Sequence, residues 1–217
     1  MKKWKVLQRI SDIGVVAVIR TRKAETAENI AWACREGGLP AVEITFTIPG
    51  ADRVIRRLRE EDAFSELIVG AGTVLDSETA RIAILAGAQF VVSPGFDEET
   101  ARLCNRYQIP YIPGCLSASE IIRAMECGAE VIKFFPGAMV EPSVIKAIKG
   151  PLPQVSIMPS GGVDLDNVED WIRNGADFVS VGSHLTDPGE KGDYRRVKEL
   201  AAEFVERVRR ARGQREG

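Results

Sequence analysis

Lys133 is the residue of this sequence whose surroundings most clearly suggest chemistry. It stands in the run Val131-Ile-Lys-Phe-Phe135, with apolar residues on both sides. In a β-strand, alternation would place Val131, Lys133 and Phe135 on one face, and inside a barrel this face is poorly hydrated. Desolvation favours the neutral amine, which attacks ketones to form a Schiff base. The alternative is a lysine that reaches water at a strand end or pairs with a carboxylate for structure.

Glu43 is the second candidate, and it lies in another apolar run, Ala41-Val-Glu-Ile-Thr-Phe46. Alternation places Ala41, Glu43 and Thr45 on one face of this strand. A carboxylate and an amine that point into the same barrel provide a proton donor, a proton acceptor and a nucleophile. The alternative is a buried structural ion pair, which is rarely worth its desolvation cost. We therefore favour a catalytic pair of Lys133 and Glu43.

Two glycine-containing segments, Ser160-Gly-Gly-Val163 and Val181-Gly-Ser183, follow later apolar runs. They lack bulky side chains, so their backbone N–H groups can turn towards an anion, and a following helix adds its positive end. Either segment alone could be a plain turn. Both together, in this order, predict a phosphate site in a barrel. The residues expected to form it are Ser160, Gly161, Gly162, Gly182 and Ser183.

Other polar residues stand at the ends of the apolar runs. Arg20 could hold a carboxylate or a phosphate through its fork of donors, or could simply be a surface residue. Thr73 and Ser93 could donate hydrogen bonds to a substrate, or could only cap their loops. His184, the only histidine of the sequence, is taken as incidental.

Eight short apolar runs recur at intervals of about 20–26 residues, which is the length of one strand and one crossover helix. They are residues 15–19, 41–46, 67–70, 90–93, 110–113, 131–135, 155–158 and 178–181. Helical spacing between them predicts helices at 24–36, 77–85, 98–107, 118–125 and 165–173, with further helices over 2–11 and after Asp193. Asp97, Ser117 and Asp164 are the expected helix caps.

This alternation predicts an α/β protein, a (β/α)8 barrel preceded by a short helix, as a single domain over residues 1–217. The alternative is an open doubly wound sheet. That fold usually carries a glycine-rich phosphate loop after its first strand, where this chain has Val18-Ile-Arg-Thr-Arg22. In a barrel the ends of all strands meet at one face, so the candidate residues would share one site.

Composition excludes several classes of protein. The 217 residues are 45% hydrophobic and 28% charged with a formal charge of −2, so no positive field is available to gather nucleic acid. No apolar run approaches the roughly 18 residues of a membrane span. The four cysteines form no C-x-x-C pair, which argues against a zinc site and suits a reducing compartment. We expect a cytoplasmic protein without nucleic-acid or membrane partners.

Seven motifs occur in one order along the chain, from about Ile10 to Val205. They are EITFTIP (43–49), GAGTV (70–74), VSPG (92–95), IPG (112–114), KFFP (133–136), PSGGV (159–163) and VGS (181–183). In this order they resemble the class I aldolase family of 2-keto-3-deoxy-6-phosphogluconate (KDPG) aldolase and 4-hydroxy-2-oxoglutarate (KHG) aldolase. The resemblance implies a (β/α)8 barrel, usually a homotrimer, and cleavage through a lysine Schiff base without a metal or other cofactor.

The resemblance also implies roles for individual residues. Lys133 matches the Schiff-base lysine, and Glu43 matches the glutamate that moves protons. The residues that match the substrate pocket are Thr73, Pro94 and Phe135, and those that match the phosphate loops are Gly161, Gly162 and Ser183. One position departs from the family pattern, because many members carry an arginine where this chain has Thr47. Those members often lack an arginine at the position of Arg20, so we infer that Arg20 supplies the same positive charge.

The expected reaction is therefore cleavage of KDPG, a small phosphorylated keto acid, to pyruvate and glyceraldehyde 3-phosphate. Cleavage of 4-hydroxy-2-oxoglutarate to pyruvate and glyoxylate is a further expected activity. Three alternatives remain. They are cleavage of the galactonate epimer of KDPG, a sugar-phosphate epimerase or isomerase on the same barrel, and a non-catalytic assembly protein.

Overall fold

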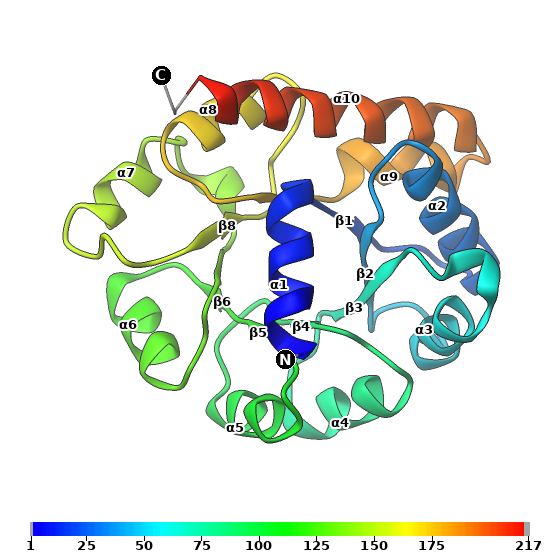
Figure 1. Cartoon of the computed structure of the whole chain (residues 1–217), viewed down its shortest axis with the longest axis horizontal. Helices are drawn as coiled ribbons and strands as arrows, with labels where there is room; N and C mark the ends of the chain where they lie inside the picture. The colour runs from blue at the N-terminus through cyan, green and yellow to red at the C-terminus, as the bar shows by residue number, and fades with distance from the viewer. Residues whose placement is uncertain (1, 215–217) are drawn as a thin grey trace.

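The structure, a computed structural model, describes residues 2–214, so the outermost residues of the expected domain, 1 and 215–217, lie outside it. Strands alternate with helices around a ring, as Figure 1 shows. All strand pairs between named strands are parallel. The strands are β1 (Val15–Ile19), β2 (Ala41–Thr45), β3 (Ile68–Gly72), β4 (Val91–Val92), β5 (Tyr111–Ile112), β6 (Gly114–Cys115), β7 (Ile132–Phe134), β8 (Ile157–Pro159) and β9 (Val179–Val181).

The predicted parallel α/β fold is confirmed, but its ladder of hydrogen bonds is divided. One sheet has the order β5-β4-β3-β2-β1-β9 and the other the order β6-β7-β8. The predicted strand 110–113 is shortened to β5, and Pro113, which has no N–H group to donate, separates it from β6. At the other junction, a single parallel bridge joins Ser160 to Ser180 of β9. The structure therefore shows a curled parallel sheet rather than an unbroken eight-stranded barrel.

The helices cover the outer side of this curled sheet, except for α1, which lies across the middle of the ring in Figure 1. The helices are α1 (Lys2–Ile13), α2 (Ala24–Glu36), α3 (Ala51–Glu60), α4 (Ser77–Leu85), α5 (Glu98–Tyr107), α6 (Ala118–Glu126), α7 (Val144–Lys149), α8 (Val168–Arg173), α9 (Ser183–Glu190) and α10 (Tyr194–Gly213). No helix among residues 2–214 is long and apolar enough to cross a membrane.

One predicted helix cap is wrong. Asp164 does not begin α8, because its carboxylate accepts the backbone N–H groups of Asp166 and Asn167 in the preceding turn. Asn167 occupies the N-cap position instead, and the helix begins at Val168 rather than at residue 165. The caps Asp97 and Ser117 are confirmed, since each side chain accepts a backbone N–H in the first turn of its helix.

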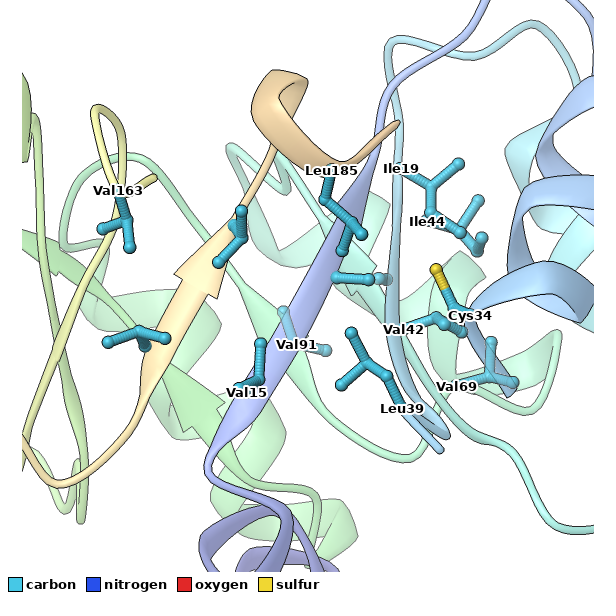
Figure 2. Close-up of a cluster of buried hydrophobic side chains, with 14 of the residues drawn as sticks. Val15, Ile19, Cys34, Leu39, Val42, Ile44, Val69, Val91, Val163 and Leu185 are labelled. Carbon is cyan, nitrogen blue, oxygen red and sulfur yellow. The ribbon is translucent and has the colours of Figure 1, made fainter. Parts of the chain in front are cut away.

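Two apolar layers lie on the two faces of the strands. Val42, Ile44, Ile132 and Phe134 belong to the outer layer, between strands and helices, part of which Figure 2 shows. The inner layer contains Ala41, Val131 and Met158, and Ile10 of α1 packs against it. Each large aliphatic side chain buried in this way contributes about 1.5–3 kcal/mol to folding. Because side chains alternate along a strand, the residues two positions after Ala41 and Val131 also face inwards.

Candidate active site

Lys133 is the residue two positions after Val131, and its amine lies on the inner side of the curled sheet. The residue is 6% exposed. Its Nζ atom lies 4.9 Å from the centre of the Phe135 ring. The strand that carries it, β7, is held on both sides, because Lys133 is opposite Gly114 of β6 and Met158 of β8. A rigid strand thus fixes the position of a nearly buried amine.

Glu43, two positions after Ala41, is 1% exposed. Neither oxygen of its carboxyl group has a hydrogen-bond partner among the described residues. Burial raises the pKa of this carboxyl group, while the positive charges of Lys133 and Arg20 act in the opposite direction. Buried polar atoms are nearly always paired in folded proteins. An unpaired carboxyl group close to two cations is therefore suited to exchange a proton with a bound molecule.

Gly72 of β3 makes room for this carboxyl group. A Cβ atom at position 72 would overlap the carboxyl group of Glu43. Glu43 of β2 is opposite Gly70 in the parallel ladder, and Gly72 lies two residues further along β3, so the Glu43 side chain extends towards the carboxyl end of that strand. The sequence interpretation missed this role, although Gly72 belongs to the GAGTV motif on which the resemblance was based.

Arg20 is held by the two threonines of neighbouring strand ends. Its guanidinium donates to the hydroxyl of Thr47 at 3.2 Å and to that of Thr73 at 3.1 Å. Thr45 also supports this arrangement. Its hydroxyl donates to the carbonyl of Ile19 at 3.1 Å and lies 2.8 Å from the hydroxyl of Thr47. Thr47, the position that departs from the pattern described above, thus holds a hydroxyl that orients Arg20.

A cavity of about 160 Å³ opens at the carboxyl ends of β1, β7, β8 and β9. It brings together many of the residues singled out from the sequence, although Glu43, Thr45, Thr73, Ser93 and Pro94 are not part of its wall. The predicted residues that line it are Arg20, Lys133, Phe135, Ser160, Gly161, Gly162, Gly182 and Ser183. The sequence interpretation did not assign Val18, Val163 and His184, which complete the wall.

Both residues of the glycine pair after β8 have a left-handed backbone conformation. Gly161 and Gly162 have φ angles of +79° and +77°, a region that favours glycine. A Cβ atom at position 162 would lie 2.8 Å from the Cα atom of Ala138. Ser160, just before the pair, accepts a hydrogen bond from the hydroxyl of Ser180 at 2.7 Å, which ties this loop to β9. Ser183 begins α9 on the other side of the cavity.

Ser93 and Pro94 lie away from the cavity wall and are part of a packed loop. The hydroxyl of Ser93 lies 2.7 Å from that of Tyr111 and donates to the carbonyl of Gly95. Burial raises the pKa of Tyr111 to about 12, so its phenol stays protonated and keeps this hydrogen bond. The carbonyl of Pro94 lies against Gly114, where a side chain would overlap it. These residues hold the loop after β4 against the strand that follows.

The fold and the site together define a class of protein. Lys133 lies nearly buried at the carboxyl ends of parallel strands, close enough to Glu43 to affect its pKa and in one cavity wall with a glycine pair, and this arrangement is typical of enzymes that act on small anionic substrates. A comparison with protein families narrows the class. Residues 6–200 match the family described as KDPG and KHG aldolase, and the chain belongs to this family.

Individual relatives agree with this assignment. The chain is 38% identical over 211 residues to the KHG/KDPG aldolase of Escherichia coli strain K12, across 95% of this chain and 98% of that protein. A structure described as native KDPGal has a TM-score of 0.85 at 31% identity, covering 92% of this chain and 96% of the other. KDPG aldolase from Legionella pneumophila, with pyruvate captured as a covalent carbinolamine, has a TM-score of 0.80 at 31% identity, covering 87% and 92%. The chain is thus an aldolase, a lyase that cleaves carbon–carbon bonds.

Proposed function

We propose that this chain cleaves KDPG to pyruvate and glyceraldehyde 3-phosphate through a Schiff base on Lys133. One observation carries the proposal, which is the nearly buried amine in the wall of a cavity, close enough to the unpaired carboxyl group of Glu43 to affect its pKa. The capture of pyruvate as a covalent carbinolamine in the Legionella relative supports it. The lysine adduct supplies the electron sink itself, so the proposal includes no metal or other cofactor.

The proposed reaction begins when the lone pair of the Lys133 amine attacks the C2 carbonyl of the substrate. Glu43 gives its proton to the carbinolamine oxygen, which leaves as water, and an iminium forms. The electrons of the C3–C4 bond move into the iminium while Glu43 accepts the proton of the C4 hydroxyl. This step releases glyceraldehyde 3-phosphate and leaves an enamine. Glu43 returns the proton to C3. Water then adds to the iminium and gives one proton back to Glu43, and the carbinolamine breaks its C–N bond, moving its hydroxyl proton to the nitrogen, to release pyruvate and free Lys133.

The remaining site residues bind and orient the substrate in this proposal. Arg20, fixed by Thr47 and Thr73, holds the carboxylate of the keto acid, and Phe135 shields the iminium from water. Thr45 and the loop of Ser93 and Pro94 act by fixing the walls. The phosphate lies against the loops after β8 and β9, and its binding energy orients the distant reacting carbons. These loops contain Ser160, Gly161, Gly162, Gly182 and Ser183.

The proposal extends to the whole molecule. Residues 1–217 form one domain, and the curled sheets close into a (β/α)8 barrel through Pro113 and the bridge between Ser160 and Ser180. The protein works in the cytoplasm as a homotrimer. Large apolar side chains on the surface support an assembly, among them Trp4 (62% exposed) and Met139 (70% exposed).

A substrate assay tests the reaction. Pyruvate release would be followed for KDPG, its galactonate epimer and 4-hydroxy-2-oxoglutarate, with Lys133→Met as the inactive variant and the exposed Lys191→Met as its control. We expect KDPG to have the highest kcat/KM, and Lys133→Met to lose at least about 10³-fold in kcat. Conversion of a sugar phosphate without release of pyruvate would instead favour an epimerase or isomerase. A higher kcat/KM for either other substrate would overturn the substrate assignment.

A further inference from the structure

A second cavity, of about 460 Å³, lies at the opposite end of the strands from the cavity that contains Lys133. Its wall includes residues of α1, together with Gly87, Ala88 and Gln89 before β4 and Gln108 and Ile109 before β5. These segments lead into the amino ends of the strands, whereas the aldolase cavity lies at their carboxyl ends. The two cavities therefore face opposite ends of the ring. Helix α1, which lines the second cavity, lies across the middle of the ring (Figure 1).

Every charged side chain in the wall of this second cavity is positive. The cations are Lys2, Lys3, Lys5, Arg9 and Arg59, and no aspartate or glutamate belongs to the wall among the described residues. Only part of this charge is neutralised. Lys3 pairs with Glu130 at 2.8 Å, and Arg9 donates to the backbone carbonyl of Glu66 at 2.9 Å. Lys2, Lys5 and Arg59 have no ion pair within residues 2–214.

The surrounding structure increases the free-energy cost of holding these positive charges together in the folded protein. The lysines stand in the first turns of α1, which has no acidic residue there to balance the positive end of the helix dipole. The stem of Arg59 is packed against Gly87, where a Cβ atom would lie 3.1 Å from Cγ of Arg59. Burial and the charge of Arg9 both lower the pKa of Arg59. Unfavourable local interactions of this kind are typical of functional sites, such as ligand-binding sites.

We propose that this cavity binds a small polyphosphate or multiply phosphorylated compound, at a site separate from the aldolase site. Its volume lies within the roughly 300–1,000 Å³ of ordinary small-molecule sites. The two guanidinium forks of Arg9 and Arg59 match phosphate oxygens, and the lysines add charge that a polyphosphate neutralises. Gln89 adds an amide, whose carbonyl oxygen accepts the N–H of Val69 at 3.0 Å and whose amino group stays available as a donor.

Binding here would stabilise the position of α1. Ile10 of this helix packs in the inner layer with Ala41 and Val131, the residues two positions before Glu43 and Lys133. A ligand that joins α1 to Arg59 and Gln89 therefore fastens the helix to the base of the site. The expected sign is a higher Tm in the presence of the ligand, because a ligand that binds only the folded state stabilises it.

Calorimetric titration with inorganic triphosphate tests the proposal, with citrate as a multiply charged carboxylate probe. Four proteins would be compared: wild type, Arg59→Gln, Lys5→Gln and Arg195→Gln. Arg195 is the matched control, because its side chain is 90% exposed on α10 and, within residues 2–214, forms an ion pair only with Glu199. We expect one binding component that Arg59→Gln and Lys5→Gln each weaken about tenfold and that Arg195→Gln leaves unchanged. All four proteins should release pyruvate at the same rate.

Equal triphosphate binding by all four proteins, or no binding by wild type, would overturn the proposal. Citrate binding as tight as triphosphate binding would overturn the assignment to phosphate compounds. Lys5 is exposed, so Lys5→Gln keeps the test valid if Arg59→Gln fails to fold. The heat of binding is measured without substrate, so the result is independent of the proposed aldolase reaction.

Discussion

The carboxyl group of Glu43 is buried without a hydrogen bond to either of its oxygens among the described residues. Leaving a buried polar group unpaired costs about 1–3 kcal/mol, and more for a charged one. Gly72 deepens the burial by letting the neighbouring strand approach the carboxyl group. The chain thus gives up stability at the residue where the proposed reaction needs a group that can hold or release a proton.

Replacing Glu43 by glutamine is predicted to lower kcat and, as pH rises, to increase the stability of the variant relative to wild type. Burial raises the folded-state pKa of Glu43 above its ordinary value of 4.5. From pH 4.5 up to the raised pKa, the unfolded carboxyl group ionises while the folded one keeps its proton, so wild-type stability falls with rising pH. Glutamine does not ionise. The Tm of Glu43→Gln relative to wild type should therefore increase through this interval, while kcat falls by about 10²–10⁴-fold.

Thermal unfolding between about pH 4 and pH 8, together with pyruvate release, measures both effects. Glu66→Gln is the control, because Glu66 is an exposed partner of Arg35 and its replacement should show neither trend. A Tm difference between Glu43→Gln and wild type that is constant with pH would contradict the assigned environment of Glu43.

Lys133 and Glu43 were predictable from the sequence because each interrupts an apolar run, and alternation placed both on the inner face. The packing of Gly72 and the position of His184 in the cavity wall were not predictable. Both depend on how separate strands approach one another, and spacing within one strand does not report that approach.

At the scale of elements, local signals decided which helices were predictable. The bounds of α2, α4 and α5 match the prediction, since each helix has clear apolar spacing and α4 and α5 have an aspartate cap. In contrast, α7 has only six residues, and α9 contains Pro188. Tertiary packing stabilises α9, because Leu185 is fully buried and Gly189 lies directly against Ile30 of α2.

The glycine loop after β8 gives a prediction about substrate preference. Gly162→Ala places a Cβ atom against Ala138 and must displace the loop that we assign to the phosphate. The KM for KDPG should rise about tenfold or more, whereas the KM for 4-hydroxy-2-oxoglutarate, which has no phosphate, should change little. Steady-state kinetics with both substrates measures the difference.

Gly192→Ala is a matched control for this variant. Gly192 has a φ angle of +82°, close to the +77° of Gly162, but among residues 2–214 no heavy atom other than those of its chain neighbours lies within 4 Å of a Cβ atom at that position. Both alanines bear the left-handed conformation, which costs about 1–2 kcal/mol, but only one displaces a loop. An equal rise in KM for both substrates in Gly162→Ala would contradict the assignment of this loop to the phosphate. The same rise in KM for KDPG in Gly192→Ala would also contradict it.

At the scale of the whole molecule, the regular spacing of strands predicted a parallel α/β ring, but not where its ladder is divided. The predicted strand 110–113 ends at Pro113, beyond which a separate strand, β6, begins, and the pairing of β4 with β5 is only two residues long. A proline in an apolar run is visible in the sequence. Its effect on the ladder depends on whether a neighbouring strand donates an N–H group to its carbonyl, and the sequence does not show this. Here the carbonyl of Pro113 accepts the N–H of Lys133 at 2.9 Å.

The proposed homotrimer is tested by its mass in solution. Size-exclusion chromatography with light scattering should give three times the 23.7 kDa of one chain. Association would cover exposed apolar side chains such as Leu75 (64% exposed) and Leu85 (60% exposed), because large exposed apolar groups are typical of contact surfaces. A mass of one chain that is independent of protein concentration would contradict the trimer.

Trapping with borohydride tests the central claim most directly, because it marks the atom that reacts. Wild type and Lys133→Met would each be incubated with pyruvate, reduced with borohydride, digested and analysed by mass spectrometry. A covalent iminium between the amine and C2 of pyruvate would be reduced to a stable secondary amine. We predict one reduced pyruvate per wild-type chain, on the peptide that contains Lys133, and none on the variant. No adduct on wild type, or an adduct on a different lysine, would contradict the account.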